Sequence, residues 1–296
     1  FKVTFFFEGE EESGSPNLVP FMKKYKKEIS SDIVLICDTW LFESRVPSIV
    51  TMLRGILKEE IIITGPDKDL HSGMYGGIST NPARVLTNVL SALHDKDGAV
   101  TIPDFYDGVL ELSQNIKDQW DDLNFKHDQF LSDVGLSAPA GEKGRSPLEM
   151  IWSRPTCEIN GINSGYINEG FKTVLPSQAS AKISFRLVGN QDPLKIRKSF
   201  REMIQNFVPL DCKVTFLEHE ASKASQMDTS SPEFEKARKA ISEEWGIEAA
   251  FVGCGGSIPI AGHFKEITGV DPMLIGFAKD DDQIHSPNEK YDLESF

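Results

Sequence analysis

Three short, unbroken apolar runs in this chain each end in side chains that commonly bind metal ions. The runs are residues 3–7, 33–37 and 273–278. The side chains that follow them include Glu11, Glu12, Asp38, residues 280–282 and His285. Unbroken apolar runs are typical of parallel strands buried on both faces, and ligands of open α/β sheets lie beyond the carboxyl ends of the strands. If the three strands share one sheet, these side chains can converge, which favours a binding site over a solvated acidic turn.

The length and composition suit a globular protein of two domains. Its 296 residues exceed the usual size of one domain, and 40% of them are hydrophobic, which suffices for a buried core. No apolar run approaches the length of a membrane span. The net charge of −14, from 31 basic and 45 acidic residues, argues against nucleic acid or an anionic membrane as a partner.

The cysteines and the first residue bear on the cellular context. Cys37, Cys157, Cys212 and Cys254 lie far apart and form no CxxC pair, which argues against a thiolate zinc cluster and a disulfide framework. We therefore expect reduced thiols and a cytoplasmic location. Residue 1 already lies in a predicted strand and no Met begins the chain, so we expect a fragment of a longer protein.

A second domain is predicted between the apolar runs. Residues 181–188 alternate between apolar and polar side chains, as a strand with one covered face does. Asp192 and Pro193 then begin a helix whose apolar stripe includes Phe200. Together with predicted strands at 61–64 and 213–217 and a helix at 82–93, this order indicates a small α+β layer of the ferredoxin-like kind. We place this inserted domain at residues 59–225, within a first domain formed by residues 1–58 and 226–296.

Five motifs occur in the order found in one known family. They are EGEEESGS at 8–15, CDTW at 37–40, DLHSGMYGG at 69–77, GGSIP at 255–259 and HSPNEK at 285–290. The chain resembles the M20-type metallopeptidases, and within them the cytosolic nonspecific dipeptidases and carnosinases. The resemblance implies an α/β fold, in which a zinc-peptidase-like mixed sheet forms the catalytic domain and an inserted α+β lid pairs two subunits into a homodimer.

The resemblance also implies a metal site and a mechanism. By motif position Glu11 is the general base, while Glu12, Asp38 and His285 are ligands of two divalent metal ions, with zinc preferred and manganese as the alternative. Zinc lowers the pKa of a bound water to about 7. A neighbouring carboxylate can take the proton of that water and pass it to the leaving amine. The expected reaction is metal-dependent hydrolysis of the peptide bond of a dipeptide.

Further residues are assigned to the substrate by the same resemblance. His71 is expected to reach the active site of the partner subunit and to stabilise the oxyanion. Arg186 has a guanidinium fork that suits the substrate carboxylate, although a structural salt bridge is the alternative. The remaining residues assigned to substrate binding are His219, Thr173, Asn163 and Ser257.

Two departures from the family pattern keep alternatives open. The first metal-binding His and the bridging Asp of the family are expected before residue 1, so the fragment alone is expected to be inactive. Cys254 stands where related dipeptidases often carry Glu, which questions recognition of a substrate amino group. An N-acyl amino acid deacylase and a non-catalytic relative are therefore the rival readings. A calcium-binding acidic module ranks last, because no twelve-residue loop with EF-hand ligand spacing is present.

Overall fold

The computed structural model describes residues 2–295, with the side chains of Glu12 and Pro259 excepted. Contacts divide the chain into two compact units. Unit 1 comprises Phe1–Leu53, Ser113–Leu123 and Ser225–Phe296, and unit 2 comprises Arg54–Leu112 and Asn124–Ala224. The sequence-based boundaries assigned residues 113–123 to the inserted domain, whereas here they belong to unit 1.

Unit 1 contains a mixed sheet of five strands. The strands are β1 (Val34–Ile36), β2 (Ser48–Leu53), β9 (Ser225–Gln226), β10 (Ala250–Cys254) and β11 (Pro272–Ile275). The order is β1-β11-β2-β10, and β9 pairs with β2. β1 runs parallel to β11 and β10 runs parallel to β2, while β11 and β2 are antiparallel. The predicted strands at 33–37 and 273–278 are thus confirmed as neighbours in one sheet.

The helices of unit 1 pack on this sheet through apolar side chains. They are α1 (Leu18–Lys24), α2 (Lys26–Ile29), α5 (Gln114–Asp122), α8 (Pro232–Trp245) and α9 (Pro259–Thr268). Met22 of α1 and Phe264 of α9 form one buried cluster with Val34 of β1. On α5, the indole of Trp120 is buried and donates a hydrogen bond to the carbonyl of Phe251 in β10 (2.9 Å). This contact joins Ser113–Leu123 to the sheet of unit 1.

The strand predicted at residues 3–7 is wrong. Residues 2–10 carry no strand, and Val3, Phe5 and Phe7 are 68%, 78% and 89% exposed. Phe6 turns inward, with its ring 6.1 Å from that of Phe264. A strand needs a neighbour to accept its ladder of hydrogen bonds, and none of the strands in the described range pairs with this segment. The composition therefore indicated apolar burial correctly for one side chain only.

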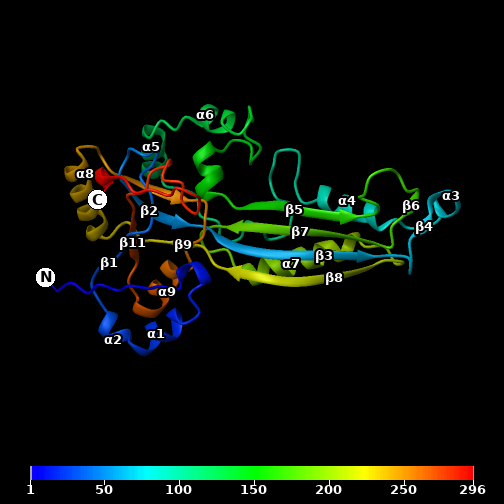
Figure 1. The fold of residues 1–296 in the computed structure, drawn as a ribbon, viewed down its shortest axis with the longest axis horizontal. Helices are drawn as coiled ribbons and strands as arrows, with labels where there is room; N and C mark the ends of the chain where they lie inside the picture. Colours follow the sequence, from blue (N-terminus) through cyan, green and yellow to red (C-terminus); the bar gives the residue numbers. More distant parts are fainter. Residues whose placement is uncertain (1, 296) are drawn as a thin grey trace. The chain divides into compact units, whose positions relative to one another are not determined.

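Unit 2 is a four-stranded antiparallel sheet with helices on one face (Figure 1). The strands lie in the order β5 (Thr156–Ser164), β7 (Gln178–Leu187), β3 (Gly55–Thr64), β8 (Lys213–Ser222). The helices α4 (Pro82–Ser91) and α7 (Pro193–Phe207) supply apolar side chains to a core shared with the sheet, including Leu86 and Phe200. The chain order of strands and helices matches the α+β layer predicted from the sequence.

The remaining elements of unit 2 are short. They are the paired strands β4 (Leu70–His71) and β6 (Val174–Leu175), and the helices α3 (Ser72–Tyr75), α6 (His127–Ser132) and η2 (Glu149–Ser153). Figure 1 shows β4, β6 and α3 beyond the end of the sheet at which β3 finishes and β7 begins. Among the described helices, none has both the length and the apolar composition that crossing a membrane requires.

Candidate functional site

The carboxyl ends of β1 and β11 lie side by side. In this parallel pair Ile36 is opposite Leu274, and a further parallel bridge joins Trp40 to Ala278. Asp38 lies between these two pairs in the sequence, so its backbone is held at the end of the sheet where β11 also ends. Open α/β sheets bind their ligands beyond these carboxyl ends of the strands. The segments that follow residues 33–37 and 273–278 therefore lie side by side in the backbone.

Gly276 makes this junction unusually close. A Cβ atom at Gly276 would lie 1.6 Å from the carbonyl carbon of Thr39, a distance that no side chain can occupy. The backbone of Ala278 then donates to the Thr39 oxygen (3.3 Å), and Leu41 donates to the oxygen of Ala278 (2.8 Å). Only glycine fits at position 276. The sequence offered this signal within the run MLIGFA, but its meaning depends on which strand lies alongside.

His285 lies in an exposed loop that begins soon after β11. The loop is tied to the segment after β1, because the hydroxyl of Ser44 donates to the Asp280 carboxylate (2.9 Å) and accepts from the Asp280 backbone N–H (2.7 Å). Asp38 and His285 thus come from two segments that contact each other both within the β1–β11 pair and after the two strands end. An oxygen donor and an imidazole nitrogen form a donor set that suits zinc.

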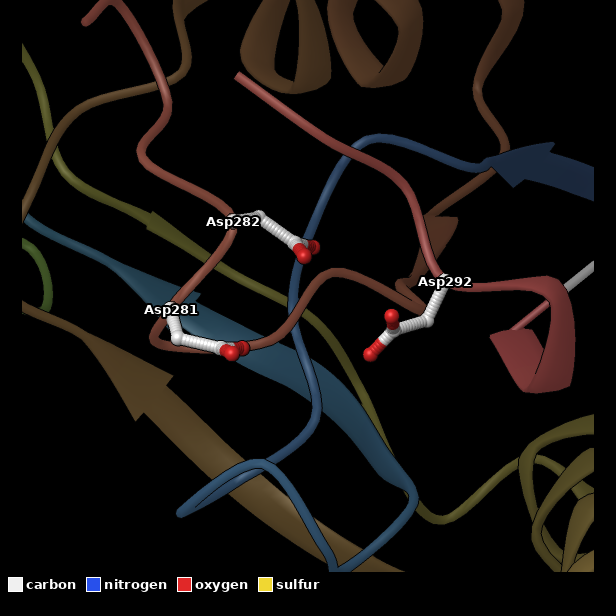
Figure 2. A group of neighbouring side chains, drawn as sticks. All are labelled: Asp281, Asp282 and Asp292. Carbon is white, nitrogen blue, oxygen red and sulfur yellow. The ribbon is translucent and has the colours of Figure 1, made fainter. Parts of the chain in front are cut away.

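Three carboxylates from residues close to His285 in the sequence converge in space, namely those of Asp281, Asp282 and Asp292 (Figure 2). Their nearest oxygens all lie within 4.8 Å of one another. Two lysine ammonium groups compensate them. Lys290 Nζ lies 3.1 Å from both Asp281 and Asp282, and Lys279 Nζ lies 2.9 Å from Asp292. The cluster is thus an ion-pair network of three carboxylates and two ammonium groups.

The pKa values in this network follow from its hydrogen bonds. The backbone N–H of Lys279 donates to Asp282 Oδ2 (2.7 Å), and this bond, more than the Lys290 ammonium, holds the pKa of Asp282 below its usual value. The bond from Lys290 to Asp282, followed by that to Asp281, raises the pKa of the Lys290 ammonium. Both groups are therefore charged at neutral pH. Lys290 was not singled out from the sequence, although it ends the HSPNEK motif.

Glu11 begins a single 3-10 turn, Glu11–Ser13, in unit 1. Its side chain is exposed, and the side chain of Glu12 lies outside the described residues. The neighbouring Glu10 has a structural role, because its carboxylate accepts from the Asn17 side-chain amide (2.8 Å) and backbone N–H (3.3 Å). Ser257 lies two residues before α9, which begins at Pro259.

His71 and Thr173 are brought together in unit 2. His71 pairs with Val174 across β4 and β6, and the carbonyl of Thr173 accepts from the backbone N–H of Ser72 (3.0 Å). The imidazole Nδ1 of His71 accepts from the backbone N–H of Gly73 (3.1 Å). An acceptor Nδ1 means that the neutral ring carries its proton on Nε2. The turn therefore fixes which ring nitrogen can donate.

Arg186, Asn163 and His219 share the sheet face opposite the helices. Residues directly opposite in antiparallel strands point to the same face, and Asn163 is opposite Ser180 on β7, six residues before Arg186. His219 reaches this face too, with Nε2 3.7 Å from the Glu60 carboxylate. At about 3.3 Å per residue, Arg186 and Asn163 are about 20 Å apart. They cannot bind the two ends of one dipeptide within a single chain.

Comparison with known proteins gives the family. The peptidase dimerisation domain of the M20 family matches residues 51–212, which is more than half of the chain. This chain belongs to the M20 peptidase family. The resemblance drawn from the five motifs is confirmed, and so is the predicted mixed α/β fold with a dimerisation domain.

Relatives of this M20 chain match it along nearly its whole length. It is 32% identical to a Cys-Gly metallodipeptidase of Candida albicans, over 98% of this chain and 61% of the relative. The solved structure of the dipeptidase Dug1p from Saccharomyces cerevisiae aligns with a TM-score of 0.77 at 29% identity, over 98% of this chain and 61% of that one. An M20 family metallo-carboxypeptidase of Sulfolobus solfataricus aligns with a TM-score of 0.80 at 26% identity, over 97% and 65%. This chain thus spans about three fifths of the length of these curated relatives.

Proposed function

We propose that the intact protein is a metal-dependent dipeptidase. The observation that carries this proposal is the 32% identity with a Cys-Gly metallodipeptidase over 98% of the chain. The neighbouring ends of β1 and β11 support it, since they hold Asp38 and the His285 loop at one sheet edge. Dipeptide hydrolysis is accordingly favoured over a purely structural role.

In this proposal Glu12, Asp38 and His285 are ligands of two divalent ions, with zinc preferred and manganese as the alternative. Bound zinc would supply a Lewis acid and a water whose pKa is lowered to about 7. Glu11, the exposed carboxylate beside Glu12, takes the proton of the attacking water and delivers it to the leaving amine. A general base of this kind typically contributes about 10²–10⁴-fold to the rate.

His71 stabilises the carbonyl oxygen of the substrate as it gains charge. The bond from Gly73 to Nδ1 leaves Nε2–H as the donor, which is the form an oxyanion requires. His71 and Thr173 belong to the end of the sheet at which β7 begins, whereas Arg186 lies at the other end (Figure 1). A fully extended dipeptide spans only about 7 Å. We therefore infer a homodimer, joined through the inserted domain, in which a second copy supplies His71.

Arg186 binds the substrate carboxylate in this proposal. It lies on the open face between its cross-strand neighbours Ile56 and Thr156, and its guanidinium can form two parallel bonds to a carboxylate. His219 lies on the same face on β8, two strands away, and the axes of the two strands are about 10 Å apart. His219 and Ser257 complete the substrate site, and Asn163 and Thr173 accompany His71 from the second copy.

A second candidate function is removal of an N-acyl group from an amino acid. Cys254, at the position where related dipeptidases often carry Glu, is buried. Its Sγ accepts a hydrogen bond from the backbone N–H of Gly256 (3.2 Å). A buried neutral thiol cannot pair with a substrate ammonium group as a carboxylate would. This observation favours substrates whose amino group is acylated.

Both functions are tested by kinetics of the intact protein loaded with Zn²⁺ or Mn²⁺. Cys-Gly and β-Ala-His are compared with the same peptides acetylated at the N-terminus. Glu11→Gln is expected to lower kcat about 100-fold or more and to leave metal content unchanged. Glu8→Gln is the matched control, because glutamine keeps the acceptor that Glu8 offers to the backbone N–H of Glu10. Activity of Glu11→Gln within about tenfold of wild type would reject the general-base assignment.

A further inference from the structure

Two residues close the loop that carries His285 at its base. The backbone N–H of Lys290 donates to the carbonyl of Asp282 (3.0 Å), and Lys290 Nζ donates to Asp282 Oδ1 (3.1 Å). Residues 283–289 therefore form a loop whose two ends are joined by a backbone bond and by an ion pair. We name this pair of contacts the Asp282–Lys290 clamp.

Asp282 is also held by hydrogen bonds to the backbone of Lys279. It is 2% exposed, its Oδ2 accepts from the backbone N–H of Lys279 (2.7 Å), and its own N–H donates to the Lys279 carbonyl (3.1 Å). Both carboxylate oxygens are thus engaged, one by the backbone and one by an ammonium group. A buried carboxylate with this bonding has one stable position, whereas the loop that it closes is exposed.

Three residues of the loop have a left-handed backbone conformation. Gln283, His285 and Asn288 have φ angles of 56°, 62° and 65°, in the left-handed region that costs energy for most residues other than glycine, asparagine and aspartate. Such conformations persist only where the surroundings impose them. Within the loop, one backbone bond is from Ser286 to Gln283 (2.9 Å). The clamp supplies the stronger constraint at the ends of the loop.

The convergence of Asp281, Asp282 and Asp292 does not by itself indicate a further metal ion (Figure 2). The ammonium groups of Lys279 and Lys290 already lie at hydrogen-bond distance from these carboxylates. An ion at this place would have to displace both cations. The network is better explained as a support for the neighbouring loop.

We propose that Asp282 and Lys290 are positioning residues, which hold the His285 imidazole in the orientation required to bind a metal ion. This inference rests on the proposed function, because it takes His285 to be a metal ligand. Residues that orient a metal ligand typically change metal affinity by about 10–100-fold when they are replaced. Neither Asp282 nor Lys290 contacts the reacting atoms in this proposal.

The test is metal titration of the intact protein, by calorimetry with Zn²⁺ and by the visible spectrum with Co²⁺. Asp282→Asn converts one acceptor into a donor, which must then face either the Lys279 N–H or the Lys290 ammonium. We expect the affinity to fall about tenfold or more and the Co²⁺ spectrum to change. Glu294→Gln is the control, since Glu294 is an exposed partner of Lys279 outside the clamp, and its affinity should stay within about threefold of wild type.

His285→Ala separates failure of this inference from failure of the proposed function. If His285→Ala binds metal as tightly as wild type, His285 is not a ligand and both proposals fall. If His285→Ala loses affinity while folded Asp282→Asn keeps it, only the positioning role is overturned. Should Asp282→Asn not fold, Lys290→Arg and Lys290→Met decide the matter. If Lys290→Arg keeps its metal affinity and Lys290→Met loses it, the positioning role of the clamp is supported. If the two variants bind metal with equal affinity, that role is overturned.

Discussion

Replacing Glu59 by Gln is expected to destabilise unit 2 more than any exposed charge reversal would. Glu59 lies on β3, and its side chain is fully buried. Its oxygens accept from Arg197 Nε (2.6 Å) and Arg201 Nε (2.8 Å) of α7, which ties that helix to the sheet. Glutamine has nearly the same volume but offers one acceptor in place of two charged oxygens. The change leaves a buried guanidinium beside a neutral amide.

The magnitude follows from the burial of the partners. Removing one partner of a buried ion pair costs about 3–5 kcal/mol. The Arg197 side chain is 7% exposed and that of Arg201 is 27% exposed, so solvent relieves part of the loss. We expect about 3 kcal/mol, the lower end of that range. Since about 1.4 kcal/mol is a factor of ten, the fraction of opened unit 2 should rise about 100-fold.

Hydrogen exchange with mass spectrometry measures this in unit 2 alone. Peptides that cover Ile61 and Ile183, which lie in the core of the sheet, report the opening of this unit. Glu220→Gln is the matched control on the same sheet, because the Lys58–Glu220 pair is 46% and 50% exposed and should contribute at most about 1 kcal/mol. If Glu59→Gln accelerates exchange by less than about fivefold, the buried pair does not stabilise the unit as argued.

Two further changes test the packing. Gly276→Ala should destabilise unit 1 by about 1–3 kcal/mol or more in urea titrations, because its Cβ would overlap the Thr39 carbonyl. Gly262→Ala in α9 is the control: a Cβ there meets open space, so this change should be neutral or mildly stabilising. Equal effects of the two substitutions on stability would refute the close approach at Gly276. Burial raises the pKa of the Cys157 thiol from 9.0 to about 12. The folded state therefore holds this proton more tightly than the unfolded state does. The stability that the protonated thiol contributes is fully present below pH 9 and is lost as the pH rises toward 12. The loss amounts to at most about 1.4 kcal/mol per pH unit. Cys157→Ala should flatten that decline in urea titrations between about pH 9 and 10.5, and an unchanged slope would contradict the burial argument.

Local signals in the sequence predicted many of the elements. Asp192 followed by Pro193 predicted the start of α7, and the Asp192 side chain does accept from the backbone N–H of Leu194. Gly246 ends α8 with a φ of 64°, a left-handed conformation that glycine commonly adopts just after a helix. These features depend on a few neighbouring residues, because helix ends are stabilised by contacts within one turn.

Strand pairing and contacts between segments distant in the chain were harder to predict from the sequence than helix ends. Residues 3–7 have strand composition without a partner strand in the described range, since pairing depends on a second segment. The packing of Trp120 against Phe251 likewise decided that Ser113–Leu123 belongs to unit 1. Polar and charged composition did not reveal that contact, which the side chains of Trp120 and Gln119 make with the backbone of Phe251.

The sequence by itself determined the family, the mixed α/β fold with its dimerisation domain, and the residues that we propose for the site, because motif order and apolar periodicity are properties of the chain. Only the tertiary structure decided how those residues are held. It placed the ends of β1 and β11 in contact at Gly276, set Arg186 and Asn163 about 20 Å apart, and closed the His285 loop with Asp282 and Lys290. These relations join residues that are distant in the chain or in the sheet, so they follow from strand register and packing, which no local pattern specifies.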